Sequence, residues 1–384
     1  MPAERLAGFG TSIFTEMSAL AERTGSINLG QGFPDEDGPV SVLDAACAAL
    51  HAGANQYAPL PGVPALRLAI AEHQRSRYGL DHDPEREVQV TFGATEAIAA
   101  ALLGLCDPGD EVIALDPAYD SYAAGAALAG ARLRRVPLHP PDWRFDPTQL
   151  AAAVTERSRL VLLNSPHNPT GRVLDRSELD AVAAVCREHD LIAVTDEVYE
   201  HLVFEGEHVP LATLPGMAER TLTISSIGKT FSFTGWKIGW ACGPAELVGA
   251  VRGAKQFMTF AGGTPLQHAA ALALGIAEEH GARLAAELAA KRDRICVGLE
   301  RAGFDVLRPA GTYFVNADVR PLGAEDAVAF CRELPERAGV VGIPTSVFSS
   351  DPERVRTLVR FAFCKREEVI DDAAERLAAM RSGS

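Results

Sequence analysis

Short apolar segments alternate with stretches of helical periodicity through the middle of the chain. Apolar and β-branched residues predict strands at 88–92, 111–115, 159–163, 191–195, 221–224 and 238–242. Apolar residues at helical spacing predict helices between several of these segments, including 96–105 and 177–189. Strands that alternate with helices are typical of a mostly parallel sheet covered on both faces. We therefore expect a large α/β domain in this part of the chain.

The two ends of the chain follow other patterns. Residues 1–38 combine a short helical pattern with a glycine- and proline-containing loop, and residues 41–80 are mostly helical. An alanine-rich segment, 269–299, predicts one long connecting helix, and short strands follow it at 311–317 and 358–363. We expect three parts: an N-terminal segment that associates with a small domain (1–38), a large domain (39–280) and a small α+β domain (281–384).

Charge and cysteine content narrow the class of protein. The formal net charge is −15, which argues against a nucleic acid partner because phosphate binding needs a basic face. The seven cysteines are odd in number and none are spaced as C-x-x-C, which argues against a disulfide framework or a metal site. No charged leader with an apolar core and no membrane-spanning apolar run is found in the sequence. We expect a cytoplasmic protein without a membrane partner.

Polar and aromatic residues follow five of the predicted strands. Because the carboxyl ends of parallel strands meet at one edge of a sheet, ligands of open α/β folds bind there. The residues in question are Thr95, Tyr119, Asn168, Asp196 together with Tyr199, and Lys229. Five such residues at equivalent positions predict one binding site at this edge.

Lys229 is one of only five lysines in the chain and lies among glycines and aromatic residues. A lysine amine that is removed from water loses part of its positive charge and becomes nucleophilic. Lys229 could therefore form a Schiff base with an aldehyde cofactor. A solvated loop lysine is the alternative, and this segment alone leaves both interpretations open.

A phosphate-bearing cofactor would find suitable groups nearby. Gly93, Ala94 and Thr95 stand at a predicted helix start, where backbone N–H groups and a hydroxyl can bind a phosphate. Ser226 and Lys237 could add a hydroxyl and a cation. These residues predict the phosphate end of the site.

If the cofactor also has an aromatic ring with a ring nitrogen and a phenolic oxygen, residues at the same strand ends could bind this ring. Tyr119 could stack on the ring, and Asp196 could keep a pyridine nitrogen protonated so that the ring accepts electrons. Asn168 and Tyr199 could hydrogen-bond the phenolic oxygen. Taken singly, Asp196 could instead be a turn or helix-cap carboxylate, and 168–171 could be a plain turn.

Arg360 lies in a strand-like run between apolar neighbours. Its planar guanidinium suits a two-pronged contact with a substrate carboxylate. An internal salt bridge is the alternative.

The combination of these residues resembles the class I aminotransferases, pyridoxal-phosphate enzymes of fold type I. The resemblance covers nearly the whole chain and rests on segments 28–35, 55–57, 164–171, 195–199, 225–240, 311–314 and 360–361. It implies a large domain that binds pyridoxal 5'-phosphate on a mostly parallel sheet flanked by helices, and a smaller α+β domain.

The resemblance also implies roles for the matching residues. Lys229, which would carry the Schiff base and move the proton, would be catalytic together with Asp196 and Tyr199. The cofactor would be bound by Gly93, Ala94, Thr95, Tyr119, Asn168, Asp196, Tyr199, Ser226, Lys229 and Lys237, and by Tyr57.

Substrate and partner follow in the same way. Arg360, Asn168 and the Gly32 backbone would take the substrate α-carboxylate, with Phe14 and Tyr313 close to its side chain. Tyr57 would reach the phosphate of the neighbouring subunit, which implies a homodimer with shared active sites.

Within the family, the chain is similar to the kynurenine, glutamine and methionine aminotransferase branch, and more so to actinobacterial N-succinyldiaminopimelate aminotransferases. This implies ping-pong transfer of an amino group to a 2-oxo acid such as 2-oxoglutarate, with N-succinyl-L,L-2,6-diaminopimelate of lysine biosynthesis as a candidate donor. Kynurenine, glutamine, methionine and aromatic amino acids are alternative donors, and a cysteine-conjugate β-lyase would use the same lysine. Aspartate is disfavoured, because Tyr119 stands where aspartate aminotransferases have a tryptophan and their second arginine is not identifiable.

Overall fold

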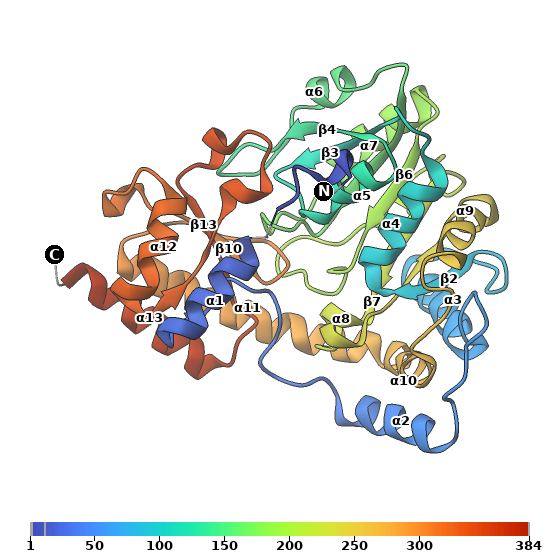
Figure 1. Ribbon diagram of the computed structural model, residues 1–384, viewed down its shortest axis with the longest axis horizontal. Helices are drawn as coiled ribbons and strands as arrows, with labels where there is room; N and C mark the ends of the chain where they lie inside the picture. Colours follow the sequence, from blue (N-terminus) through green and yellow to red (C-terminus); the bar gives the residue numbers. More distant parts are fainter. Residues whose placement is uncertain (1–2, 11–12, 383–384) are drawn as a thin grey trace.

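The computed structural model describes residues 3–10 and 13–382, with only the backbone described at residues 381 and 382. A large α/β lobe and a smaller lobe lie side by side in Figure 1, with α12 and α13 marking the smaller one. Among the described residues, no helix combines the length and the apolar character needed to cross a membrane.

The large lobe is built on a seven-stranded sheet in the order β2-β8-β7-β6-β5-β3-β4. Strands β3 to β7 run parallel, and β8 is antiparallel to both of its neighbours, so the expected mostly parallel sheet is confirmed. The strands are β2 (Val88–Phe92), β3 (Glu111–Asp116), β4 (Arg132–Pro137), β5 (Ser158–Asn164), β6 (Ile192–Asp196), β7 (Thr221–Ser226) and β8 (Ile238–Cys242).

Successive residues of a strand point to opposite faces of the sheet, and each face has its own helices. Val112 and Ala114 of β3 pack under α4 (Gly93–Leu105), α5 (Ser121–Leu128) and α9 (Ala245–Gln256). Ile113 and Leu115 of the same strand pack under α6 (Pro147–Ala152) and α7 (Arg176–Glu188). Both faces are therefore covered, as expected for parallel strands.

A third group of helices closes the β2 edge of the sheet. It consists of α2 (Val40–His51), α3 (Pro64–Tyr78) and α10 (Thr264–Gly275). The expected single helix over 269–299 is wrong. Ile276 has φ −113° and ψ 9°, so α10 ends at Gly275 and α11 (Ala277–Ala302) begins after it. Glycine and a β-branched residue side by side are weak helix formers.

The smaller lobe contains a four-stranded antiparallel sheet in the order β12-β13-β10-β9. Its strands are β9 (Asp305–Leu307), β10 (Phe314–Asp318), β12 (Ile343–Pro344) and β13 (Leu358–Ala362). Helix α13 (Glu367–Ser382) packs beside α11, and α12 (Ala327–Ala338) packs beside α13. The N-terminal α1 (Ile13–Thr24) lies against α12, and β1 (Ile27–Asn28) pairs with β11 (Val340–Val341). The division of the chain at 38–39 and 280–281 stays a prediction, and its first and last parts include residues outside the described ranges.

Candidate active site

A cavity of about 350 Å³ opens at the carboxyl edge of the large sheet. Its walls include thirteen of the fifteen predicted site residues, which come from both lobes. They are Phe14, Gly32, Gly93, Ala94, Thr95, Tyr119, Asn168, Asp196, Tyr199, Ser226, Lys229, Lys237 and Arg360. Residues that are hundreds of positions apart in the sequence therefore share one cavity.

Lys229 enters this cavity from the turn after β7. It lies in the short α8 (Ile227–Thr230), and its Nζ is 5.7 Å from the ring centroids of both Tyr199 and Tyr313. Enclosure by the cavity walls removes water from the amine and lowers the pKa of Lys229 below its ordinary value. A larger fraction of the amine is then neutral, which a nucleophile or a proton acceptor requires.

Asp196 lies buried at the end of β6. Its Oδ2 accepts a hydrogen bond of 2.7 Å from the Tyr122 hydroxyl, and its Oδ1 accepts one of 3.4 Å from the Val198 N–H. Burial raises the pKa of Asp196 to about 6, although both hydrogen bonds act in the opposite direction. The carboxyl is thus prepared to share a proton with a basic group inside the cavity.

Arg360 of β13 lines the cavity, and the two groups that accept its hydrogen bonds are uncharged. Its Nη1 donates to Oδ1 of Asn168 at 2.8 Å, and its Nη2 donates to the Gly30 carbonyl at 3.1 Å. Among the described residues no carboxylate forms a salt bridge with Arg360, so the alternative of an internal salt bridge is wrong. Burial lowers the pKa of Arg360 to about 10, which still leaves it charged at neutral pH.

Asn168 is held in place by its neighbours. Its N–H donates to Oδ1 of Asn164 at 2.7 Å, and Nδ2 of Asn164 donates to the Asp196 carbonyl at 2.8 Å. The ends of β5 and β6 are thereby joined beneath the cavity, and the side chains of Asn168 and Asp196 have fixed relative positions.

The start of α4 forms the other end of the cavity. Gly93 has φ 71°, and a Cβ at this position would lie 3.3 Å from Nζ of Lys237. A Cβ on Gly239 would lie 2.6 Å from the Gly93 carbonyl carbon, so β8 approaches the helix start as closely as a glycine permits. A helix N-terminus, the Lys237 ammonium and the Ser226 hydroxyl together offer donors and positive charge, which fit a phosphate group.

Two predicted residues do not line the cavity. Tyr57 is 82% exposed, and its ring meets Phe260 edge-on at 5.8 Å. Tyr313 is buried behind the wall, where its ring contacts Tyr199 at 5.5 Å and its hydroxyl donates to the Gly32 carbonyl at 2.7 Å.

The structure also brings in residues that the sequence pattern did not single out. Tyr122 lies on α5 and its ring meets that of Tyr119 edge-on at 5.7 Å, while its contact with Asp196 is tertiary and had no signal in the sequence. Further wall residues are Gln31, Phe33, Ile98, Asp120, Asn164, Val198, Gly228, Thr234, Ile238 and Phe314. Most of them are apolar or lie in loops, where no periodicity marks a site.

Comparison with known proteins places this geometry in a family. The family described as "Aminotransferase class I and II" matches residues 24–377. The chain is 52% identical to "Probable N-succinyldiaminopimelate aminotransferase DapC" of Mycobacterium tuberculosis, over 99% of this chain and 98% of that protein. It is 42% identical to "Methionine aminotransferase" of Escherichia coli, over 98% of both chains.

The solved structures agree with these sequence relatives. The structure of N-succinyldiaminopimelate aminotransferase from Mycobacterium tuberculosis superposes with a TM-score of 0.97 at 52% identity, and the match covers 99% of this chain and 100% of that one. The fold type I architecture that the sequence predicted is thereby confirmed. The chain belongs to the class I and II aminotransferases.

Proposed function

We propose that the cavity binds pyridoxal 5'-phosphate and that Lys229 is the residue to which the cofactor is attached and which moves the proton in transamination. The observation that carries this proposal is the placement of the Lys229 amine and the Asp196 carboxyl in one cavity whose wall also carries the charged Arg360. The donor groups at the start of α4 fit the phosphate, and the acceptor at Asp196 fits a protonated ring nitrogen.

The bound cofactor would supply an aldehyde and a ring that withdraws electrons from the substrate Cα–H bond. Asp196 would hold the ring-nitrogen proton, because burial makes this carboxyl a better proton acceptor than an exposed aspartate. Lys229 would accept the Cα proton at Nζ, for which its lowered pKa suits it. Tyr199 and Asn168 would hydrogen-bond the phenolic oxygen, and Tyr119 would cover the ring.

Arg360 would orient the substrate. Its guanidinium has five N–H donors, of which two are used by Asn168 and Gly30, and its Nε has no partner among the described residues. The remaining donors can bind the α-carboxylate, together with the Asn168 amide and the Gly32 backbone. Because the aromatic faces of Phe314 and Phe348 lie 4.0 and 4.5 Å from the Arg360 guanidinium carbon, the fork is held in one plane.

For the amino donor we propose N-succinyl-L,L-2,6-diaminopimelate, with 2-oxoglutarate as acceptor in a ping-pong reaction. Support comes from the full-length similarity to the mycobacterial protein of that name. Methionine and kynurenine are the next donors to test, since relatives of those names are 42% and 38% identical. A panel of donors decides among them, with each donor added to the holoenzyme without an acceptor and followed by the change in the cofactor's absorbance.

We further propose a cytoplasmic homodimer with shared active sites. Large apolar side chains are exposed on α2, on α3 and after α9, and the examples Val40, Leu68 and Phe257 are 69%, 58% and 86% exposed. Apolar residues exposed in one region of a monomer favour a subunit interface there. Tyr57, with its ring against Phe260, lies among these elements and would reach the partner's phosphate site.

The attachment of the cofactor is tested by borohydride reduction. Reduction should fix pyridoxal phosphate to the peptide containing Lys229, and Lys229→Ala should lose both the label and, by several orders of magnitude, the turnover. Lys291→Ala is the matched control, because Lys291 pairs with Glu36 outside the cavity and should keep both. Label on another lysine, or normal turnover in Lys229→Ala, would refute the proposal.

A further inference from the structure

A second cluster of chemically reactive side chains lies behind the active site. Its members are His73 of α3 and the neighbouring residues Glu200 and His201 of the turn after β6. All three are buried, with exposed fractions of 7%, 3% and 7%. The cluster lies on the opposite face of β7 from the cavity, because Ser226 faces the cavity and the preceding Ser225 bonds Glu200.

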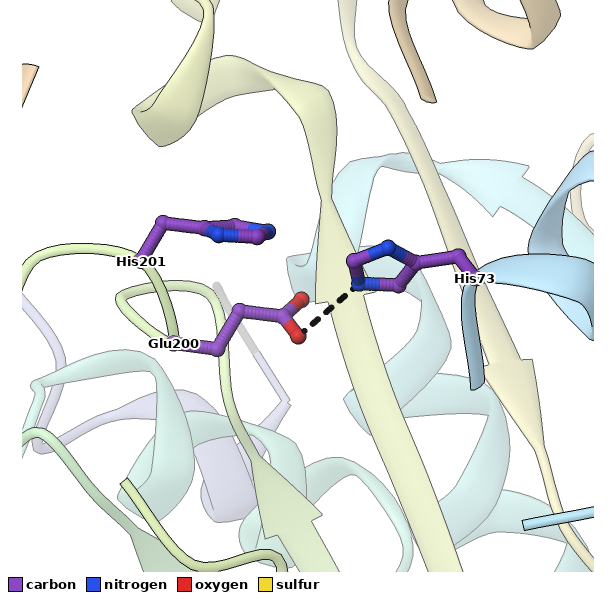
Figure 2. Close-up of side chains that lie close together, drawn as sticks. All are labelled: His73, Glu200 and His201. Carbon is purple, nitrogen blue, oxygen red and sulfur yellow. Dashed lines mark hydrogen bonds and ion pairs between the residues drawn. The ribbon is translucent and has the colours of Figure 1, made fainter. Parts of the chain in front are cut away.

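The three side chains converge on one point. His73 Nε2 lies 3.2 Å from Oε2 of Glu200, and one ligand atom from each residue lies within 4.8 Å of the other two. Figure 2 shows the two imidazole rings on either side of the Glu200 carboxylate, with the His201 ring directed toward His73. Two histidines and one carboxylate are a donor set that zinc prefers.

His201 is the member that hydrogen bonding does not explain. His73 and the nearby His208 each contact a buried carboxylate, Glu200 and Glu197 respectively. In contrast, neither ring nitrogen of His201 has a hydrogen-bond partner in the described part of the chain. Its ring packs against the α11 backbone, since a Cβ on Gly281 would lie 2.8 Å from Nδ1, so the ring can move only away from α11, toward His73 and Glu200. The His201 ring nitrogens are not among the fully enclosed atoms without a partner, and His201 lines the adjoining cavity, so they are open to a ligand that enters from it.

The surroundings complete the requirements of a metal site. Tyr78 and Ser225 donate hydrogen bonds of 2.6 and 2.7 Å to the two oxygens of Glu200, and such outer contacts orient a ligating carboxylate. Two cavities of about 500 and 520 Å³ reach the cluster from the surface, one lined by His73 and the other by Glu200 and His201. An ion therefore has access without unfolding of the lobe.

We propose that His73, Glu200 and His201 bind a divalent transition metal of the zinc type. Three protein ligands would hold the ion, and water would fill the fourth position of a tetrahedron. At Zn–ligand distances of about 2.1 Å the ligand atoms must come within roughly 3.4 Å of each other, so the His201 ring moves inward by about 1 Å. The ion takes the place of the hydrogen bond between His73 and Glu200, and each histidine binds it through an unprotonated ring nitrogen. The cysteine pattern, which argued against a metal, has no bearing on a site without cysteine.

Metal binding is measured on chelator-treated holoenzyme by dialysis against Zn²⁺ and by titration with Co²⁺, whose visible ligand-field bands report tetrahedral coordination. We expect about one ion per chain at micromolar free metal, and a higher melting temperature with Zn²⁺. His201→Ala and the similarly sized His201→Gln should lower the affinity by at least about 10-fold and abolish the melting shift. The exposed His51→Ala and His268→Ala are matched controls that should bind like the unaltered chain.

The same experiment separates the alternatives. The cofactor is identical in all variants, so metal held by the cofactor would be independent of His201. Uptake that is absent in the unaltered chain, or equal in the chain and in both His201 variants, would show that the cluster is a hydrogen-bonded ion pair only. None of these measurements depends on transamination, so they test the metal site independently of the proposed function.

Discussion

Tyr122 and Asp196 are joined by a hydrogen bond of 2.7 Å between the tyrosine hydroxyl and Oδ2 of the carboxylate. The contact links α5 to the end of β6 beneath the candidate active site, and both residues are buried. A hydrogen bond to a carboxylate stabilises its charged form, so Tyr122 opposes the effect of burial on the pKa of Asp196.

Removal of this hydroxyl should therefore change the acid–base behaviour of the site. Tyr122→Phe loses a hydrogen bond to a charged group, worth about 1.5–3 kcal/mol, which is equivalent to a further rise of roughly one to two pH units in the pKa of Asp196. Asp196 would then keep more of the shared proton, and we expect kcat to fall about 10-fold, with the acid limb of its pH profile moved to higher pH. Unchanged kcat and an unmoved limb would show that Tyr122 only fills space.

Asp196 should also make the cofactor-free protein less stable at neutral pH. Because burial raises the pKa of Asp196 from 3.8 to about 6, the native state binds this proton more tightly than the unfolded chain. Its contribution to stability is greatest below pH 4, declines between about pH 4 and 6, and is smallest above that range.

Asp196→Asn removes the titration while keeping the side-chain size. We expect the free energy of unfolding of the cofactor-free variant to exceed that of the unaltered chain by about 3 kcal/mol at pH 8, and the difference to become small near pH 4. Thermal or urea unfolding at the two pH values measures it. Asp116→Asn is the control, because Asp116 contacts Arg135 at 2.8 Å and the loss of that ion pair should destabilise the protein at pH 8. A variant that is less stable at pH 8 would contradict the expectation.

In the large sheet, the sequence pattern predicted the strands in which apolar residues are continuous or alternate with polar ones, and it missed β4, in which they do neither. The expected boundaries of β2 and β8 agree with the structure. Strand β4 escaped prediction because Arg132, Arg134 and Arg135 interrupt its apolar run. As the edge strand of the sheet it is half exposed, so charged side chains are tolerated there.

Site residues were predictable where the chemistry is distinctive and the position is tied to a strand end. Lys229 and Asp196 meet both conditions. Tyr122 and Asn164 act on other site residues across the fold, and only tertiary contacts show this. Likewise, His73 comes from α3 and meets Glu200 only because α3 packs at the edge of the sheet.

Arg360 should prove to be a determinant of substrate binding rather than of the chemical step. In Arg360→Lys a single ammonium replaces the planar fork, so the two-pronged contact with a carboxylate is lost. We expect KM for the amino donor to rise roughly 10- to 100-fold while kcat changes less. Steady-state kinetics with 2-oxoglutarate at saturation measures both constants. Arg356→Lys, at an exposed position with pairs to Glu353 and Asp326, is the control and should leave KM unchanged. An unaltered KM in Arg360→Lys would place the carboxylate elsewhere.

Shared active sites can be tested by mixing two inactive variants. Tyr57→Ala should bind the cofactor weakly because the side chain, 82% exposed in a single chain, is proposed to reach the phosphate of the partner subunit. Lys229→Ala should be inactive for a different reason. In a hybrid dimer, the subunit that keeps Lys229 receives an intact Tyr57 from its partner, so one of the two sites is complete. Random exchange in an equal mixture gives hybrids for half of the dimers, and we expect recovery of about a quarter of the normal activity at limiting cofactor.

Two further mixtures are controls. Tyr57→Ala mixed with Arg360→Ala should recover activity in the same way, whereas Lys229→Ala mixed with Arg360→Ala should recover none. Since both of those residues act within one chain, their hybrids contain no complete site, and recovered activity in that mixture would contradict the proposed arrangement.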